Sequence, residues 1–153
     1  LMIVIAVALL MRVGMAWYVI FLPVLLAIET LLIIGIAFYL SALNVFYRDV
    51  SSMFELIVMA WFYVTPIIYP LEVAEQRITE SIGPGWFKVY MLNPIAPIVA
   101  ALRKLVLYDR GEGELQRGQL TLYLAVAIGI SLLIVTSGWL VFRRLSRRFA
   151  DEL

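Results

Sequence analysis

Two short polar interruptions hold most of the side chains in this sequence that could recognise a ligand or a partner. Residues 44–51 read Asn-Val-Phe-Tyr-Arg-Asp-Val-Ser, and residues 93–99 read Asn-Pro-Ile-Ala-Pro-Ile-Val. Neither offers paired carboxylates, a nucleophile beside a base, or a glycine loop that cradles phosphate. The chain also lacks cysteine and histidine, which removes most zinc and haem sites. We therefore expect recognition rather than catalysis, with no metal and no cofactor in this chain.

The composition indicates that these interruptions lie within a membrane protein. Hydrophobic residues make up 64% of the chain and charged residues 15%, and the mean hydropathy is +1.00. The apolar runs are continuous and rich in Leu, Ile and Val, whereas the strands of a barrel would alternate every second residue. The net charge of +1 gives no reason to expect a nucleic-acid partner. The predicted fold class is an all-α integral membrane protein.

Hydropathy further predicts one transmembrane domain over residues 1–153, built as a helical bundle. Three full spans are expected at 16–43, 52–69 and 119–142, since about 20 apolar residues cross a bilayer. Residues 1–11 are too short to cross, and Leu1 lies inside an apolar run. We therefore expect a truncated span there, in a fragment that lacks its N-terminal half. Within the first full span, Gly35 would allow close helix contact.

The region between the second and third full spans predicts a re-entrant hairpin over residues 86–108. This stretch is apolar and aromatic, yet Asn93, Pro94, Pro97 and Arg103 interrupt it. One continuous helix is disfavoured because proline lacks a backbone donor. Irregular backbone at membrane depth must be sheltered by protein or water. Arg103 could bind lipid phosphates or an anionic substrate, or simply extend to the headgroups.

Orientation follows from the basic tail, residues 143–153, where four arginines end the last span: Arg143, Arg144, Arg147 and Arg148. Arginines close to a span end favour the cytoplasmic side. The C-terminus and the polar break at residues 44–51 would then be cytoplasmic, and the hairpin would lie on the opposite side.

The cytoplasmic break predicts a docking surface for another protein. Arg48 and Asp49 alone would suggest an ordinary solvated pair. With Asn44, Phe46 and Tyr47 beside them, the surface becomes aromatic and partly apolar, as docking surfaces often are.

Two further groups of residues are candidates for transport. The aromatic side chains of the second full span could line a path along which sugar rings stack, or form an interfacial belt that packs helices; they are Trp61, Phe62, Tyr63 and Tyr69. Glu29 lies deep in the first full span, where a charge costs several kcal/mol. It could be a proton or cation site, or a hydrogen-bonded residue at a helix interface.

Taken in order, these motifs resemble the permease subunit of ABC-2 type exporters. The likeness rests on residues 44–50, on Thr65-Pro66-Ile67-Ile68-Tyr69-Pro70, on residues 93–99, and on a last span with a basic tail. The closest subgroup is the polysaccharide exporters for O-antigen, capsule or teichoic acid. The resemblance implies residues 44–49 on the ATPase side and an outer gate around Asn93, Pro94, Pro97 and Arg103.

The resemblance also implies a function, partners and a location. The chain would be a permease, not an enzyme, that moves a lipid-linked polysaccharide across the bacterial inner membrane among membrane lipids. Its partners would be a second permease copy and two cytoplasmic ATPase subunits, which would hold ATP and Mg. Export of a drug or small lipid, an ion-coupled carrier using Glu29, and a passive membrane scaffold are the alternatives.

Overall fold

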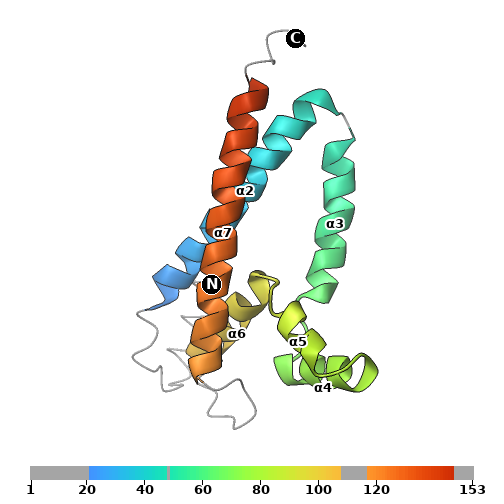
Figure 1. The fold of residues 1–153 in the computed structure, drawn as a ribbon, viewed down its shortest axis with the longest axis vertical. Helices are drawn as coiled ribbons and strands as arrows, with labels where there is room; N and C mark the ends of the chain where they lie inside the picture. Colours follow the sequence, from blue (N-terminus) through green and yellow to red (C-terminus); the bar gives the residue numbers. More distant parts are fainter. Residues whose placement is uncertain (1–20, 48, 108–116, 147–153) are drawn as a thin grey trace.

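The computed structural model describes residues 21–47, 49–107 and 117–146, and all regular structure in these ranges is helical. The predicted all-α class is confirmed. Figure 1 shows the helices, which are α2 (Leu22–Phe46), α3 (Val50–Val64), α4 (Leu71–Ser81), α5 (Gly85–Tyr90), α6 (Ile95–Leu107) and α7 (Arg117–Ser146). The predictions for residues 1–11, Arg48, Arg147 and Arg148 lie outside the described residues.

Two of the described helices, α2 and α7, are long and apolar enough to cross a membrane. At about 1.5 Å per residue, their 25 and 30 residues extend about 37 and 45 Å. They account for the spans predicted at 16–43 and 119–142. Helix α2 ends three residues after the first predicted span, and α7 ends four residues after the other. Pro23 lies in the first turn of α2. A backbone N–H at that position would have no hydrogen-bond partner within the helix, so proline is tolerated there.

The helices α2 and α7 pack closely against each other because each has a glycine at their crossing. An ideal Cβ on Gly138 would lie 2.6 Å from the carbonyl oxygen of Gly35. A Cβ on Gly35 would lie 2.7 Å from the backbone nitrogen of Val135. Both distances are too short for a real side chain, so neither backbone could approach the other if these residues were larger. The close contact expected at Gly35 is confirmed, and Gly138 is its partner.

The second full span, predicted at 52–69, is not confirmed. Helix α3 ends at Val64 after 15 residues, which extend about 22 Å, less than the hydrocarbon core of about 30 Å. Thr65 is extended, with ψ at 139°, as expected for a residue before proline. None of the residues of α3 is buried. Figure 1 shows α3 splayed away from α2.

The polar stretch after residue 70 forms a helix that hydropathy did not predict. Helix α4 occupies residues that lack any span-length apolar run. It ends at Ser81, two residues before Gly83, whose φ of 121° suits glycine. Helices α5 and α6 follow, and their axes bend by 90° at the break between them. Such a bent pair fits the predicted re-entrant hairpin, and it also fits a broken span.

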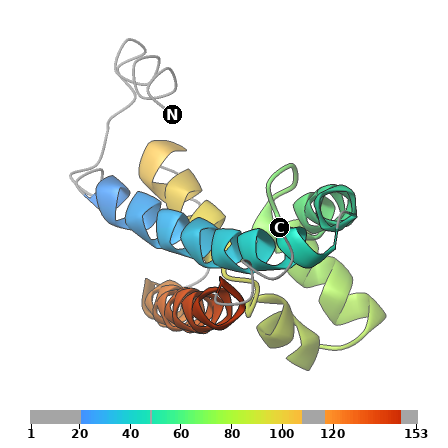
Figure 2. The ribbon, with the colours of Figure 1, turned by 90° about the horizontal axis from the view of Figure 1, so that it is seen from above.

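The described helices give the molecule two distinct ends (Figure 1). We call the end with α4, α5, α6 and the starts of α2 and α7 the hairpin end. We call the other end, with the α2–α3 connection and the end of α7, the break end. Figure 2, a view from the break end, shows α7 beside α2, with α3 and α4 displaced to one side. The break and Arg143 therefore share one end, as their predicted common side requires.

Replacing Gly138 with alanine should destabilise the protein, because the new methyl group would overlap backbone atoms of α2. The expected loss is about 1–3 kcal/mol, as for other overpacked sites. The matched control is Gly129→Ala in the same helix, where an added Cβ meets nothing within 4 Å. That control should be neutral or slightly stabilising, since alanine favours helix. Thermal unfolding in detergent, followed by tryptophan fluorescence, measures both. Equal melting temperatures for the two variants would contradict the close crossing.

Candidate functional site

Asn93 joins the hairpin to the end of α3 through both atoms of its side-chain amide. The indole N–H of Trp61 donates to Asn93 Oδ1 at 3.0 Å, and Asn93 Nδ2 donates to Thr65 Oγ1 at 2.9 Å. Thr65 Oγ1 donates in turn to the carbonyl of Trp61 at 2.8 Å. Asn93 Oδ1 also accepts the backbone N–H of Ile95 at 3.2 Å, which fixes the start of α6. The network therefore uses the donor and the acceptor of one asparagine to position two helices.

Arg103 binds the backbone turn that follows α3. Its guanidinium donates to the carbonyl oxygens of Pro66, Ile67 and Tyr69 at 3.2–3.3 Å. These carbonyls lack helical partners because the prolines at 66 and 70 interrupt the helix. No carboxylate forms an ion pair with Arg103 in the described part of the chain. The charge therefore faces neutral carbonyl dipoles rather than an acid.

Tyr69 connects the same turn to α5. Its hydroxyl lies 3.2 Å from the hydroxyl of Tyr90 and 3.0 Å from the carbonyl oxygen of Val64. Burial, and then the hydrogen bond and proximity of Tyr69, raise the pKa of Tyr90 above that of an ordinary tyrosine. Tyr90 therefore keeps its proton at physiological pH, and its hydroxyl links α5 to Tyr69.

The structure brings the two predicted groups of this end together. Trp61 and Tyr69, predicted for a substrate path, contact Asn93 and Arg103, predicted for an outer gate. Pro94 and Pro97 are both buried, with Pro97 below 2% exposure. Phe62 and Tyr63 remain exposed at 41% and 64%. The roles assigned to these residues stay predictions.

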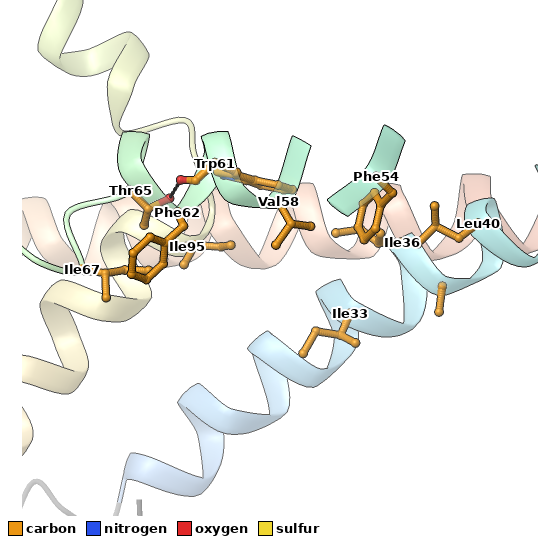
Figure 3. A pocket seen from close by; sticks show the side chains of 11 residues that line it. Ile33, Ile36, Leu40, Phe54, Val58, Trp61, Phe62, Thr65, Ile67 and Ile95 are labelled. Carbon is orange, nitrogen blue, oxygen red and sulfur yellow. Dashed lines mark hydrogen bonds between the residues drawn. The ribbon is translucent and has the colours of Figure 1, made fainter. Parts of the chain in front are cut away.

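An apolar groove of about 370 Å³ separates α2 from α3 (Figure 3). Its walls are almost entirely hydrocarbon, and the hydroxyl of Thr65 is already engaged in the network described above. The lining residues are Ile33, Ile36, Ala37, Leu40, Phe54, Val58, Trp61, Phe62, Thr65, Ile67 and Ile95. A sugar chain would find few hydrogen-bond partners here, so this groove suits an apolar occupant better.

The predicted docking residues that the structure describes lie at or beside the turn between α2 and α3, at the break end. Ser51 Oγ donates to Asn44 Oδ1 at 2.9 Å, which ties the start of α3 to the end of α2. Tyr47 is 64% exposed, Asp49 and Asn44 are exposed, and Phe46 is partly exposed. Asp49 is the N-cap residue of α3, but its side chain makes no capping hydrogen bond. The aromatic and acidic side chains of this turn are therefore accessible to a partner.

Glu29 is partly buried on α2. It precedes Ile33 by four residues and Ile36 by seven, so it shares the face of α2 that lines the groove. No ion pair or hydrogen bond of its side chain occurs in the described part of the chain. The structure thus brings no second charged group to Glu29 there.

Two residues of the hairpin network, Thr65 and Tyr90, were not predicted from the sequence as functional. Thr65 is 1% exposed and holds Asn93, while Tyr90 holds Tyr69. For Thr65 a signal existed, because a hydroxyl within an apolar run needs a hydrogen-bond partner when it is buried. For Tyr90 no local signal existed, since its partner lies 21 residues away.

Replacing Asn93 with alanine should weaken the hairpin network, because it leaves the Trp61 N–H and Thr65 without their partner. The expected destabilisation is about 1–3 kcal/mol. The control, Gln76→Ala, removes an exposed side-chain amide on α4 and should change stability by less than about 0.5 kcal/mol. A double-mutant cycle with Trp61→Phe then isolates the coupling by thermal unfolding. Additive effects of the two substitutions would contradict the direct bond.

Comparison with known proteins relates the chain to membrane permeases. Two O-antigen export system permease proteins RfbA from Klebsiella pneumoniae are 24% and 26% identical to it over 131 residues, which is 86% of the chain and 44% of each relative. The permease protein RfbA of Myxococcus xanthus is 25% identical over 89 residues, or 58% of the chain and 32% of the relative.

The chain spans less than half of the length of these curated relatives. No family model matches the chain, and no solved structure matches it. The apolar helices α2 and α7 agree with a multi-pass membrane protein. The resemblance inferred from the sequence motifs is therefore confirmed as a similarity between this chain and O-antigen export system permease proteins.

Proposed function

We propose that this chain is part of the permease subunit of an ATP-driven exporter, which moves a lipid-linked polysaccharide across a bacterial inner membrane. The observation that carries the proposal is the similarity to O-antigen export permeases over 86% of the chain. The arrangement of the helices is compatible with it, since the docking residues and the hairpin lie at opposite ends of α2 and α7 (Figure 1).

In this proposal the energy comes from a separate ATPase subunit, which holds ATP and Mg and docks at the break end. Exposed Tyr47 and Asp49 supply an aromatic and an acidic contact for that partner. When the ATPase displaces this turn, α3 moves with it, because no residue of α3 is buried against another helix. Two ATPase copies and two permease copies would form the complete exporter, with the break end in the cytoplasm.

The movement of α3 would reach the hairpin through the hydrogen bonds at its far end. Trp61 and Thr65, in and just after the last turn of α3, bind Asn93 directly. A shift of α3 therefore shifts the start of α6, which is the outer gate in this proposal. The transition is a rigid-body movement of one short helix, one of the established ways in which proteins switch.

Replacing Arg48 and Asp49 together with alanine should lower export at least fivefold, with normal membrane insertion and protein level. The reason is the loss of the charged contacts to the ATPase. Export of O-antigen to the cell surface and co-purification of the ATPase measure the effect. The control pair, Arg77→Ala with Glu80→Ala on α4, alters exposed charges of both signs at the hairpin end. Full export by the Arg48 and Asp49 variant would exclude the docking role.

An ion-coupled carrier is the second candidate, because Glu29 is partly buried in α2 without an ion pair in the described part of the chain. Such carriers usually place further charges or broken helices near the midplane. The ATP-driven proposal predicts that Glu29→Gln leaves export within about twofold of the wild type, since glutamine has nearly the same size and the proposal assigns no role to a proton at this position. Loss of export in this variant, together with dependence on the proton gradient, would favour the carrier.

A further inference from the structure

The groove between α2 and α3 ends beside a positive charge. Ile67 connects the two features, since its side chain lines the groove and its carbonyl oxygen accepts a hydrogen bond from Arg103 at 3.2 Å. The guanidinium therefore lies beside the backbone of a residue that lines the hairpin end of the groove, within reach of the headgroup of a lipid whose chain occupies the groove.

The walls of the groove select an apolar occupant. Branched aliphatic side chains on α2 face aromatic and aliphatic side chains on α3, as Figure 3 shows for Ile33, Ile36, Phe54 and Val58. A volume of about 370 Å³ lies within the range of pockets that take small organic ligands, roughly 300–1,000 Å³. In a bilayer the hydrocarbon that is available everywhere is a lipid acyl chain.

The charge of Arg103 indicates the headgroup of that lipid. Its three hydrogen bonds go to neutral carbonyls, and a guanidinium has more N–H donors than these bonds use. Glu29 shares the groove face of α2, yet no ion pair joins it to Arg103 in the described part of the chain. The guanidinium therefore keeps a net positive charge, and phosphate oxygens are well suited to its unused donors.

The position of α6 places this cation at a suitable depth. Ile98 and Ala101 of α6 pack against Leu25 and Ile28, which lie in the first two turns of α2. Arg103 is therefore near the end of a span, where lipid headgroups lie, and not at the middle of the bilayer. A lipid whose phosphate meets Arg103 would extend its acyl chain toward the break end, along the groove.

We propose that the α2–α3 groove binds one anionic glycerophospholipid, with its phosphodiester at Arg103 and an acyl chain between α2 and α3. The bilayer around the groove supplies glycerophospholipids, and the phosphodiester of an anionic one offers oxygens for the unused donors of Arg103. The site therefore takes a lipid of the surrounding bilayer rather than the diphosphate-linked anchor of a transport substrate. Because it requires no transport, the proposal stands apart from the proposed function.

The test measures lipid retained by the purified protein in a mild detergent, by native mass spectrometry, after addition of phosphatidylglycerol or phosphatidylcholine. Wild-type protein should retain phosphatidylglycerol at least fivefold more than phosphatidylcholine. Arg103→Gln should lower phosphatidylglycerol retention at least fivefold, whereas Arg77→Gln, at an exposed arginine on α4, should not. Arg103→Lys, which keeps the charge, should retain most of the binding.

A second pair of variants tests the groove without disturbing the carbonyl contacts of Arg103. Val58→Trp fills the groove and should lower retention at least fivefold, whereas Met59→Trp lies on the exposed face of the same helix and should not. Unchanged retention in both Arg103→Gln and Val58→Trp would overturn the proposal. So would retention of a polyprenyl diphosphate in preference to phosphatidylglycerol. If Val58→Trp does not fold, unchanged retention in Arg103→Gln alone overturns the proposal.

Discussion

The close approach of α2 and α7 at Gly35 and Gly138 sets the geometry of the described part of the chain. Within a bilayer, lipid tails are as apolar as the helices, so helix association depends on tight packing and hydrogen bonds rather than on escape from water. The packed face of α7 is accordingly made of small residues, with Ala127, Ser131 and Gly138 all buried. This pair forms the frame on which the other helices are arranged.

The remaining helices depend on that frame in different ways. Helix α6 packs against the first turns of α2 and against Leu120 and Leu124 near the start of α7. Helix α3 has no such packing and is held mainly at its two ends, by the Ser51–Asn44 bond and by the Asn93 network. A helix held at its ends and free along its length leaves the groove beside α2 open. The same arrangement would allow a displacement of α3 at the break end to reach the hairpin end.

Much of this architecture was predictable from the sequence, because it depends on composition and local chemistry. The spans α2 and α7 follow from continuous apolar runs, and the end of α3 follows from the prolines at 66 and 70. Helix α4 was missed because a polar helix in a membrane protein has no hydropathy signal. The length of α3 was overestimated because Thr65-Pro66-Ile67-Ile68 is as apolar as a span, yet its backbone is not helical.

The residues of the candidate sites could be predicted from the sequence, but the contacts between them could not. Asn93, Trp61 and Arg103 could each be identified from residue type and neighbours. Their joining into one network could not, since Trp61 and Asn93 are 32 residues apart and meet only because α5 and α6 fold back below α3. The groove could not be predicted from the sequence either, because its shape depends on the angle between α2 and α3. Such angles are set by packing at the helix ends rather than by any local pattern.

The proposed function requires the break end and the hairpin end to face opposite sides of the membrane, with the break end in the cytoplasm. Because the chain contains no cysteine, single cysteines can be introduced at Tyr47 and at Glu80, both of which are exposed. A membrane-impermeant thiol reagent applied to intact spheroplasts should label the cysteine at 80 but not the one at 47, and inverted vesicles should give the reverse. Labelling of both positions from the same side, or labelling of 47 from outside, would contradict the account.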